Sequence, residues 1–437
     1  MFSIPNPTVP KEISNAYEYL YARKILGELK QGIVYSDEPQ FYLYSCEYFN
    51  NKKSHIKLRG FGSDDNEDVA VTHAIAEAIE YYCITHESGK YIHASYKKLD
   101  TKAIDPLRFV PFSQSQLAQN KYKKFIVTHD SELNWLNGYS LTNNKKVLIP
   151  ASLAYANYNS RQNEEPVIRM PISTGSACGF SQSFALYRGL CEMIERDSYM
   201  ISFLPEMEKK LVTIDSDDKV FMIKRRIERY GFEVYYINTS LDTSVNTFVC
   251  ILIDRSGIAP AVCVGLGGDL NPEKAIITAS YEAVRRHITN RNSFFRPNRK
   301  SAPKKYSFDW VLWRKFQLWS APHMIREAEE IIRAARSVKF KNLKNKEQIS
   351  NDKNVDLIVN ELRQLNCEVF FVDMRTLEVA QTGLFVTKVL SPEMVPLWRD
   401  DRFPYLGVKR LYEVPKKFGA NTTSDLSSLE FTKIYPF

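Results

Sequence analysis

Hydrophobic residues along the chain alternate between the helical period and the strand period, which is typical of a mixed α/β protein. Residues 11–30 have the apolar spacing of one helix, and residues 32–34 and 41–49 have that of strands. Asn-Gly and Asn-Asn turn signals lie within residues 135–149, so this segment is predicted to form a hairpin, and residues 124–128 are a further strand candidate.

The second half of the chain repeats this layering. Helices are predicted at 215–230, 272–290 and 309–336, and strands at 234–238, 248–253, 261–266, 368–373 and 383–390. The third of these strands runs into the glycine-rich residues 265–269, which are predicted to form a turn before the next helix. Trp310, Trp313 and Phe316 are expected in the core, and the lysine-rich residues 340–354 are predicted to form an exposed linker.

A run at residues 184–203 predicts an amphipathic helix that follows a loop of small residues at 173–179. At about 100° per residue, one side carries Leu186, Leu190, Met193 and Ile194, and the other carries Arg188, Glu192, Glu195 and Tyr199. Glu192 and Glu195 are three residues apart, so both could reach one cation or two neighbouring cations. For a single helix, a solvated face with an Arg188–Glu192 pair is the alternative interpretation.

The same pattern occurs a second time, which favours the functional interpretation. Residues 70–84 predict a helix with Glu77 and Glu80 on one face, together with His73 and Tyr81, and a glycine-bearing loop at 59–62 is expected before it. Two such helices packed side by side would bring four glutamates together, which is a strong site for hard cations and a poor structural device. His73 is equally compatible with a packed histidine and with a ligand.

Composition sets broad limits on the function. The 437 residues are 44% hydrophobic and 25% charged, with a net charge of +8, as in an ordinary soluble chain. Part of the positive charge gathers in one cluster, namely Arg285, Arg286, Arg291, Arg296, Arg299, Lys300, Lys304 and Lys305. This cluster is interpreted as a solvated loop, a groove for phosphates or an acidic peptide, or a nucleic-acid patch. Nucleic acid is the least favoured, because the sequence has no helix-turn-helix, zinc-finger or RNA-recognition signature.

The cysteines and the N-terminus bear on the compartment. The seven cysteines are odd in number and form no CxxC pair, which indicates a reducing compartment and argues against a structural zinc. The N-terminus lacks a basic region followed by an apolar run, and no apolar stretch approaches the ~20 residues that a membrane span needs. We therefore expect a cytoplasmic protein with no membrane partner.

Three stretches together resemble a known family. They are Ser173-Thr174-Gly175-x-Ala177-x-Gly179, then Gly189-Leu190-x-Glu192-x-Ile194-Glu195-Arg196-Asp197, and the earlier Glu77-Ala78-Ile79-Glu80. In this order they resemble the YcaO family, whose members use ATP and Mg2+ to activate a peptide-bond oxygen. The resemblance implies an α/β (α+β) YcaO-type fold of mixed sheets and packed helices, with the ATP and Mg2+ site between glutamate-bearing helices. It covers residues 32–437, of which residues 416–437 are the C-terminal tail, and it leaves residues 1–31 as a helical lead-in.

The resemblance also assigns roles to individual residues. It implies that Glu77, Glu80, Glu192 and Glu195 hold Mg2+ and that Arg196 neutralises charge in catalysis. It also implies that the terminal carboxylate of Phe437 assists proton transfer. It further implies that ATP is bound by six residues, namely Ser173, Thr174, Arg59, Arg196, Glu282 and Arg286. The sequence departs from the family pattern at Phe61, Tyr81 and His287. Its C-terminal tail also departs from the pattern, because it ends with only one proline where the family commonly has a proline-rich tail. Arg59, Arg285 and Arg286 are candidates to replace the basic groups lost at the first two positions.

The C-terminal third, with prolines at 392, 396, 404 and 415, resembles the azoline-forming branch of the family. That branch makes thiazoline or oxazoline rings from Cys, Ser or Thr in ribosomally made precursor peptides, including bacteriocins and other antibiotics. The resemblance implies a homodimer, a leader-binding partner related to ubiquitin-activating enzymes, and in some complexes a flavin dehydrogenase. The partner is expected as a separate protein, because residues 1–31 are too short for a leader-binding domain. A backbone thioamide or amidine as the product, and a catalytically inactive scaffold subunit, are the alternatives.

Overall fold

A computed structural model describes residues 9–49, 58–87, 90–99, 102–158, 164–204, 207–215, 219–257, 260–294, 315, 318–343, 345–347, 350–398, 400–420 and 426. These residues form three sheets with helices packed against them, which confirms the predicted mixed α/β fold. None of the described helices is long and apolar enough to cross a membrane.

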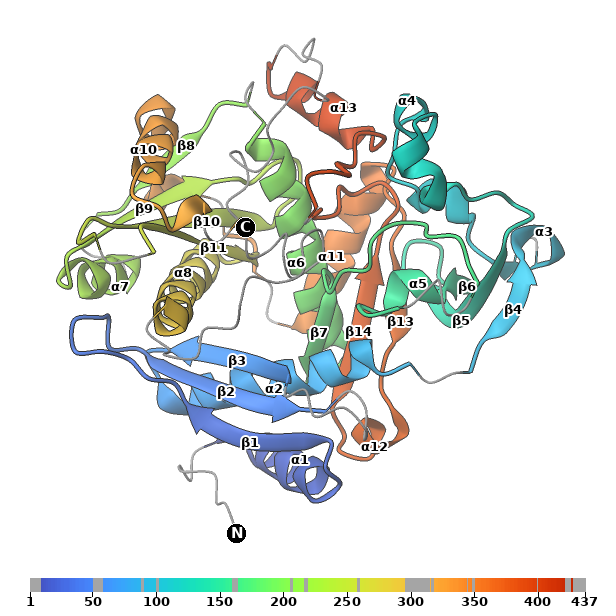
Figure 1. Ribbon diagram of the computed structural model, residues 1–437, viewed down its shortest axis with the longest axis horizontal. Coiled ribbons are helices and arrows are strands. Elements are labelled where there is room, and N and C mark those ends of the chain that lie inside the picture. Colours follow the sequence, from blue (N-terminus) through green and yellow to red (C-terminus); the bar gives the residue numbers. More distant parts are fainter. Residues whose placement is uncertain are drawn as a thin grey trace.

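The first sheet is antiparallel and is formed by the N-terminal part of the chain. Its strands, in spatial order, are β1 (Leu26–Gln31), β2 (Tyr42–Tyr48) and β3 (Leu58–Asp64). Helices α1 (Lys11–Ala22) and α2 (Glu67–Thr85) pack against it, at the bottom of Figure 1. The predicted helix at 11–30 therefore ends at Ala22, because the chain turns into β1, and the strand predicted at 32–34 is wrong.

The second sheet lies on the left of Figure 1 and is formed by strands between residues 210 and 339. Its strands, in spatial order, are β11 (Val262–Asp269), β10 (Asn246–Asp254), β9 (Phe232–Asn238), β8 (Lys210–Thr213) and β12 (Arg336–Lys339). Its neighbouring helices are α7 (Lys219–Glu228), α8 (Pro272–Phe294) and α10 (Met324–Ala334). The glycines at 265, 267 and 268, predicted as a turn, are instead part of β11, where each pairs with a residue of β10.

The third sheet joins strands from both halves of the chain. In spatial order they are β4 (Ile92–Ser95), β5 (Glu132–Ser140), β13 (Phe370–Asp373), β14 (Phe385–Leu390) and β7 (Ser176–Gly179), with β6 (Lys145–Pro150) paired to β5. The β5–β6 pair confirms the hairpin predicted at 135–149. Helices α6 (Gln182–Ser202) and α11 (Asn351–Gln364) pack together beside this sheet.

Short elements and connections complete the described chain. They are α3 (Tyr96–Leu99), η2 (Pro106–Phe109), α4 (Gln114–Leu117), η3 (Asn120–Phe125), α5 (Ala151–Ala154), η4 (Phe340–Asn342), α12 (Leu377–Ala380) and α13 (Arg410–Lys417). The strand predicted at 124–128 is wrong, since η3 ends there. The segment 340–354, predicted as an exposed linker, begins with the buried Phe340, and α11 begins within it at Asn351. Trp310, Trp313 and Phe316 lie outside the described residues.

Local sequence explains where the long helices begin. Asn66, Ser181 and Ser350 are the N-cap residues of α2, α6 and α11, and each side chain accepts a hydrogen bond from a backbone N–H of the first turn. Such a cap satisfies one of the free N–H groups at a helix start. The caps therefore set the register in which α2 and α6 carry their glutamates.

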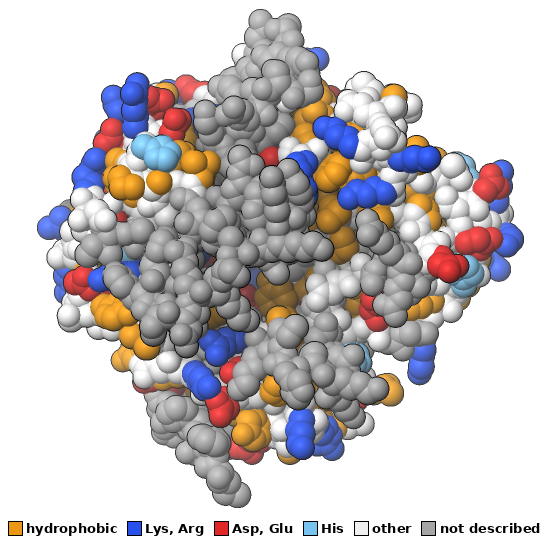
Figure 2. All heavy atoms as spheres, viewed as in Figure 1, with side chains coloured by type: hydrophobic (Ala, Val, Ile, Leu, Met, Phe, Trp, Pro, Cys, Tyr) orange, Lys and Arg blue, Asp and Glu red, His pale blue; other side chains and the backbone are white. Residues whose placement is uncertain are grey.

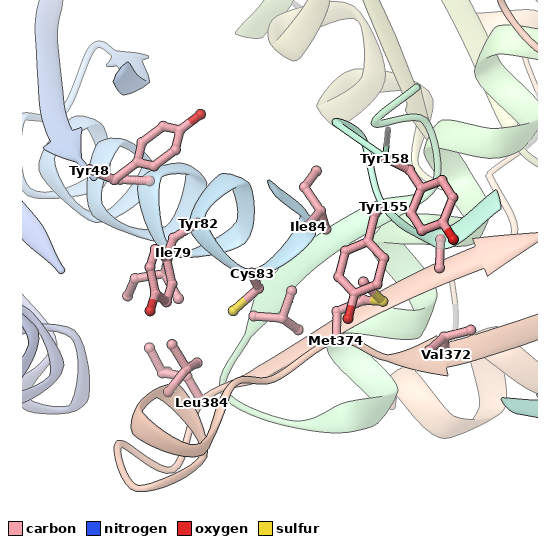
Figure 3. Close-up of a cluster of buried hydrophobic side chains, with 14 of the residues drawn as sticks. Tyr48, Ile79, Tyr82, Cys83, Ile84, Tyr155, Tyr158, Val372, Met374 and Leu384 are labelled. Carbon is pink, nitrogen blue, oxygen red and sulfur yellow. The ribbon is translucent and has the colours of Figure 1, made fainter. Parts of the chain in front are cut away.

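Apolar contacts hold the three sheets together. Figure 3 shows Ile79, Tyr82 and Cys83 of α2 close to Leu384, which leads into β14. A second cluster joins Phe41, which precedes β2, to the core of the second sheet. On the described rim of the face in Figure 2, acidic and basic side chains are interspersed. The helix between the first and third sheets, α2, is therefore fixed on both of its sides.

Candidate functional site

Three strand–helix units surround the candidate site: β3 with α2, β7 with α6, and β11 with α8. In the first and third units, glycines let the helix lie directly on its strand. A Cβ atom on Gly62 of β3 would lie 2.0 Å from the backbone oxygen of Ala70 in α2. A Cβ atom on Gly267 of β11 would lie 2.0 Å from the backbone oxygen of Ala275 in α8. Since real Cβ atoms do not approach backbone this closely, only glycine permits these two packings. The expected glycine loop at 59–62 is thus part of a strand, where its glycines make room for a helix.

Each of the three helices carries a glutamate at its eleventh residue, namely Glu77 in α2, Glu192 in α6 and Glu282 in α8. Each of these carboxylates accepts a hydrogen bond from a backbone N–H that precedes its helix. The donors are Phe61 to Glu77, Gly175 to Glu192 at 3.1 Å, and Leu266 to Glu282 at 2.7 Å. The backbone therefore positions all three carboxylates in the same way.

The three units close into a ring. Helix α2 contacts β7 of the second unit, α6 contacts β11 of the third, and α8 contacts β3 of the first; Figure 1 shows the three units around the centre of the molecule. One turn after the first glutamate of each helix come Glu80, Glu195 and Arg285, followed by Tyr81, Arg196 and Arg286. We call Glu77, Glu80, Glu192, Glu195 and Glu282 the glutamate ring.

Three arginines lie among these carboxylates. Arg196 is 3.5 Å from Glu192 and 3.3 Å from Glu195. Arg286 and Arg285 are 3.1 Å and 3.5 Å from Glu282. The Glu282–Arg286 pair is therefore not a surface pair, because Glu282 is also anchored to the backbone of β11.

Mutual repulsion and burial disturb the protonation of the ring. Burial, followed by the charges of Glu282 and Glu192, raises the pKa of Glu195 to about 8, against the opposing effect of Arg196. Burial and the neighbouring Glu192 and Glu77 also hold the pKa of Glu80 well above its usual value. In contrast, the pKa of Glu282 is lowered, because the three arginines outweigh its burial. Several of these carboxylates thus lack enough positive charge around them.

The ring fits hard cations better than it fits a closed ion-pair network. Glu80 has no hydrogen bond or ion pair with any of the described residues. Among those residues, no three His, Cys, Asp or Glu side chains are grouped closely enough to hold one metal ion. Because Mg2+ is commonly bound by one or two carboxylates plus substrate phosphates and water, the arrangement suits cations that a phosphate ligand helps to bind.

The loop before β7 is held by a buried lysine that sequence reasoning missed. Lys388 of β14 is fully buried and donates hydrogen bonds of 2.7 Å to the backbone oxygens of Ile172 and Thr174. Its charge also lowers the pKa of Glu80, although less than burial raises it. A single charged residue in a strand that is otherwise uncharged, Val386 to Leu390, was the available signal. Lys388 therefore links the loop containing Thr174 to the glutamate ring.

The remaining predicted residues have different positions. Ser173 is half-buried, and its backbone oxygen accepts a hydrogen bond from the backbone N–H of Ser176 in the turn before β7. Thr174 is buried. Arg59 contacts Glu47 of β2 at 3.4 Å and makes no described contact with the ring. Phe437 and the predicted basic cluster from Arg296 onward lie outside the described residues.

His73 and Arg291 have structural surroundings that the sequence did not indicate. His73 is exposed to solvent yet has protein on most sides, and burial, followed by Arg188, lowers its pKa to about 4. A neutral His73 is therefore expected near neutral pH. Arg291 pairs with Asp37 at 2.9 Å, so it does not belong to a free basic patch.

The departures from the family pattern have structural roles in this chain. The Phe61 ring lies 5.7 Å from the Arg285 guanidinium, and its backbone N–H anchors Glu77. Tyr81 is stacked on Tyr48 of β2. His287 is buried and lies 3.2 Å from Asp254. These side chains are thus accommodated without displacing the glutamates.

Comparison with known proteins gives a family match and two curated relatives. A family model described as "YcaO cyclodehydratase, ATP-ad Mg2+-binding" matches residues 61–395. Over 166 residues, the chain is 30% identical to an uncharacterized protein of Methanothermobacter thermautotrophicus and 26% identical to an "uncharacterized protein in tfuA 3'region" of Rhizobium leguminosarum bv. trifolii. These matches cover 36% of this chain and only 42% and 39% of the relatives' lengths.

Solved structures share the fold at low sequence identity. "Heterocyclase in complex with substrate and Cofactor" has a TM-score of 0.72 at 19% identity, over 96% of this chain and 57% of that chain. The Methanopyrus kandleri YcaO structure bound with AMPPCP and Mg2+ has a TM-score of 0.64 at 15% identity, over 88% and 90%. The E. coli microcin synthetase McbBCD complex has a TM-score of 0.63 at 14% identity, over 94% and 96%. The similarity extends over nearly the whole described fold.

Proposed function

The chain belongs to the YcaO family, and we propose that it is an ATP- and Mg2+-dependent cyclodehydratase that forms azoline rings in a peptide. The observation that carries this proposal is the glutamate ring, in which three helices present carboxylates from equivalent positions. A ring of this kind would destabilise the fold if it had only a structural role, because each buried carboxylate disfavours its neighbours. Cation binding would relieve that repulsion.

The side chains of the ring suit a bound nucleotide. Glu77, Glu80, Glu192 and Glu195 would hold Mg2+, with phosphate oxygens completing its shell. Arg196 and Arg286, which stand among the glutamates, would neutralise the charge that develops on the phosphates. Ser173 and Thr174 would border the nucleotide, in a loop that Lys388 holds in place. Arg59 would contact the phosphates only after leaving Glu47.

The chemistry follows from the poor leaving group in an amide. A Cys, Ser or Thr side chain of the substrate adds to the preceding carbonyl carbon and loses its proton. ATP supplies the phosphoryl group that converts the former carbonyl oxygen into a phosphate leaving group, and the C=N bond of the ring forms as phosphate departs. The residues of the chain contribute by positioning groups and neutralising charge, which supply most of the catalysis in phosphoryl transfer. We assign proton transfer to the terminal carboxylate of Phe437 and charge neutralisation to Arg196.

We further propose that the substrate is a ribosomally made precursor peptide delivered by a separate leader-binding protein, with the chain acting as a homodimer in the cytoplasm. The supporting observation is that a microcin synthetase complex with pro-MccB17 bound shares this fold, with a TM-score of 0.60. By the same reasoning, a flavin dehydrogenase would belong to the complex if the azolines are oxidised further.

Mass spectrometry of a modified peptide tests the proposed product. The purified chain is incubated with ATP, Mg2+, the leader-binding protein and the precursor peptide encoded beside it. We expect each modification to remove the mass of one water and to consume one ATP, with the glutamine double variant Glu192→Gln/Glu195→Gln inactive. Replacement of an oxygen by sulfur, seen only with a sulfide source, would identify a thioamide-forming enzyme. ATP consumption with an unmodified peptide would contradict the proposal.

A further inference from the structure

A cavity lies outside the glutamate ring. It has a volume of about 520 Å3 and is enclosed by η2, the end of α11, residues 391–396 and the start of α13. Figure 1 shows α13 at the top of the molecule, above the end of α6. None of the ring glutamates lines this cavity. Its volume lies within the usual range of pockets that hold small ligands.

Arg169 forms part of the wall of this cavity and lacks a counter-charge. The residue is only 7% exposed, and its Nη1 atom is buried without a hydrogen-bond partner. Neither a hydrogen bond nor an ion pair joins Arg169 to any of the described residues. Because a guanidinium stays charged in proteins, the cavity wall contains an uncompensated buried cation. Buried charges are normally paired, so this one indicates a missing anion.

The other two arginines of the wall, the exposed Arg108 and the buried Arg410, are already paired. Arg108 lies 2.8 Å from Glu368 and 2.7 Å from Glu393. Arg410 lies 2.6 Å from Asp197 and 2.9 Å from Asp242. The protein thus supplies carboxylates to its neighbours and leaves Arg169 without one.

Three further charged side chains reach the cavity from its exposed side, and one of them, Lys417, lies 3.7 Å from Asp242. Lys409 and Glu413 both line it, and both are exposed at the start of α13. Their opposite charges cancel in the balance of the wall and are screened by solvent. Arg169 is therefore the buried charge of this wall that has no carboxylate partner among the described residues.

We propose that this cavity binds a carboxylate through Arg169, at a site separate from the glutamate ring. The planar guanidinium matches a carboxylate in two parallel hydrogen bonds. Arg108 and Arg410 are paired with four carboxylates, so the wall repels a phosphate dianion more strongly than a singly charged carboxylate. Leu107, Phe109, Met394 and Val414 also line the cavity, so a ligand with an apolar body next to its carboxylate fits. The carboxylate belongs to a small organic acid or to the terminus of a peptide.

The cavity and the glutamate ring use different sides of α6. Asp197, which pairs with Arg410 in the cavity wall, comes two residues after Glu195. Two residues of a helix are about 200° apart around its axis, so these carboxylates point in nearly opposite directions. Binding in the cavity therefore does not depend on the proposed peptide chemistry and can be measured without nucleotide.

Calorimetry with hexanoate and its neutral analogue hexanamide tests the proposal on the unaltered protein. We expect hexanoate to bind and to raise the thermal midpoint, and hexanamide and inorganic phosphate to bind at least tenfold more weakly. Equal binding of hexanoate and hexanamide, stronger binding of phosphate, or no binding of hexanoate at millimolar concentration would each overturn it.

The variant Arg169→Met assigns the binding to one residue. We expect at least tenfold weaker hexanoate binding, and without ligand a thermal midpoint no lower than that of the unaltered protein, because a buried cation is removed. The control Arg326→Met changes an exposed arginine of α10 that pairs with Glu330, and hexanoate binding should persist there. Unchanged binding in Arg169→Met would refute the assignment. If Arg169→Met does not fold, the hexanoate and hexanamide comparison still decides.

Two further arms identify the source of the carboxylate and exclude the glutamate ring. If acetyl-leucyl-alanine binds more tightly than hexanoate and its C-terminal amide does not bind, the carboxylate is that of a peptide terminus. If hexanoate binds more tightly than acetyl-leucyl-alanine, the ligand is a small organic acid. Hexanoate should bind the Glu192→Gln/Glu195→Gln variant with unchanged affinity. Loss of binding there would place the hexanoate site in the ring and overturn the proposal.

Discussion

Replacing Glu195 with glutamine removes a carboxylate that the fold tolerates poorly without a cation. The pKa of Glu195 is raised from 4.5 to about 8 in the folded chain, first by burial and then by Glu282 and Glu192. Below pH ~4.5 the side chain is protonated in both the folded and the unfolded chain, so the variant and the unaltered protein should be equally stable. As the pH rises toward 8, only the unfolded chain loses this proton, and the unaltered protein loses stability relative to the variant.

The size of this effect follows from the change in pKa. Each tenfold change in proton affinity corresponds to about 1.36 kcal/mol, so the stability difference should grow to about 5 kcal/mol at most by pH 8. Urea unfolding with EDTA present, at several pH values from 4.5 to 8, measures it. The control Glu330→Gln changes an exposed glutamate of α10 and should show no such trend. Parallel pH profiles for Glu195→Gln and the unaltered protein would refute the reasoning.

Three other substitutions test the scaffold of the site. Gly267→Ala should lower the free energy of unfolding by about 3 kcal/mol or more, because its Cβ would meet the backbone oxygen of Ala275. The control Gly231→Ala, in open space with a φ of +85°, should cost only about 1–2 kcal/mol. Equal losses for the two variants in urea unfolding would contradict the packing argument. Lys388→Met should weaken ATP binding at least tenfold in calorimetry, because two charge-assisted hydrogen bonds to the loop at 172–174 are lost; unchanged affinity would show that the loop does not border the nucleotide. Asp197→Asn should cost about 3–5 kcal/mol in urea unfolding, because it breaks a buried pair with Arg410, and a loss below 1 kcal/mol would contradict that view of the pair.

Sequence periodicity predicted the elements that carry the glutamates but not the way in which they meet. Capped, strongly patterned helices such as α6 can be placed from local spacing, because the cap and the apolar face are encoded within one segment. The helix predicted at 11–30 was too long, because the chain leaves it to pair with β2, a contact that lies outside the predicted segment. The glycines at 60 and 62 and at 265–268 were predicted to form a loop and a turn. They are instead part of β3 and β11, where they allow a helix to approach the strand.

The equivalence of the first and third units was legible in the sequence but was not used. Gly60 and Gly62 recur as Gly265 and Gly267, and Glu77 recurs as Glu282, each 205 residues later. That spacing predicts two similar strand–helix units and places Glu282 beside the other glutamates. By contrast, the unpaired state of Arg169 and the role of Lys388 depend on residues far away in sequence, so no local pattern indicates them.

ATP binding at the glutamate ring is the most direct test of the proposed function. Calorimetry compares ATP titrations with and without Mg2+ for the unaltered chain, for Glu192→Gln/Glu195→Gln and for the exposed control Glu330→Gln. The proposal predicts Mg2+-dependent micromolar binding that the double variant loses and the control keeps. Binding that is independent of Mg2+ or that survives in the double variant would contradict the assignment of the ring. No binding by the unaltered chain, with the leader-binding protein present as well, would favour an inactive scaffold subunit.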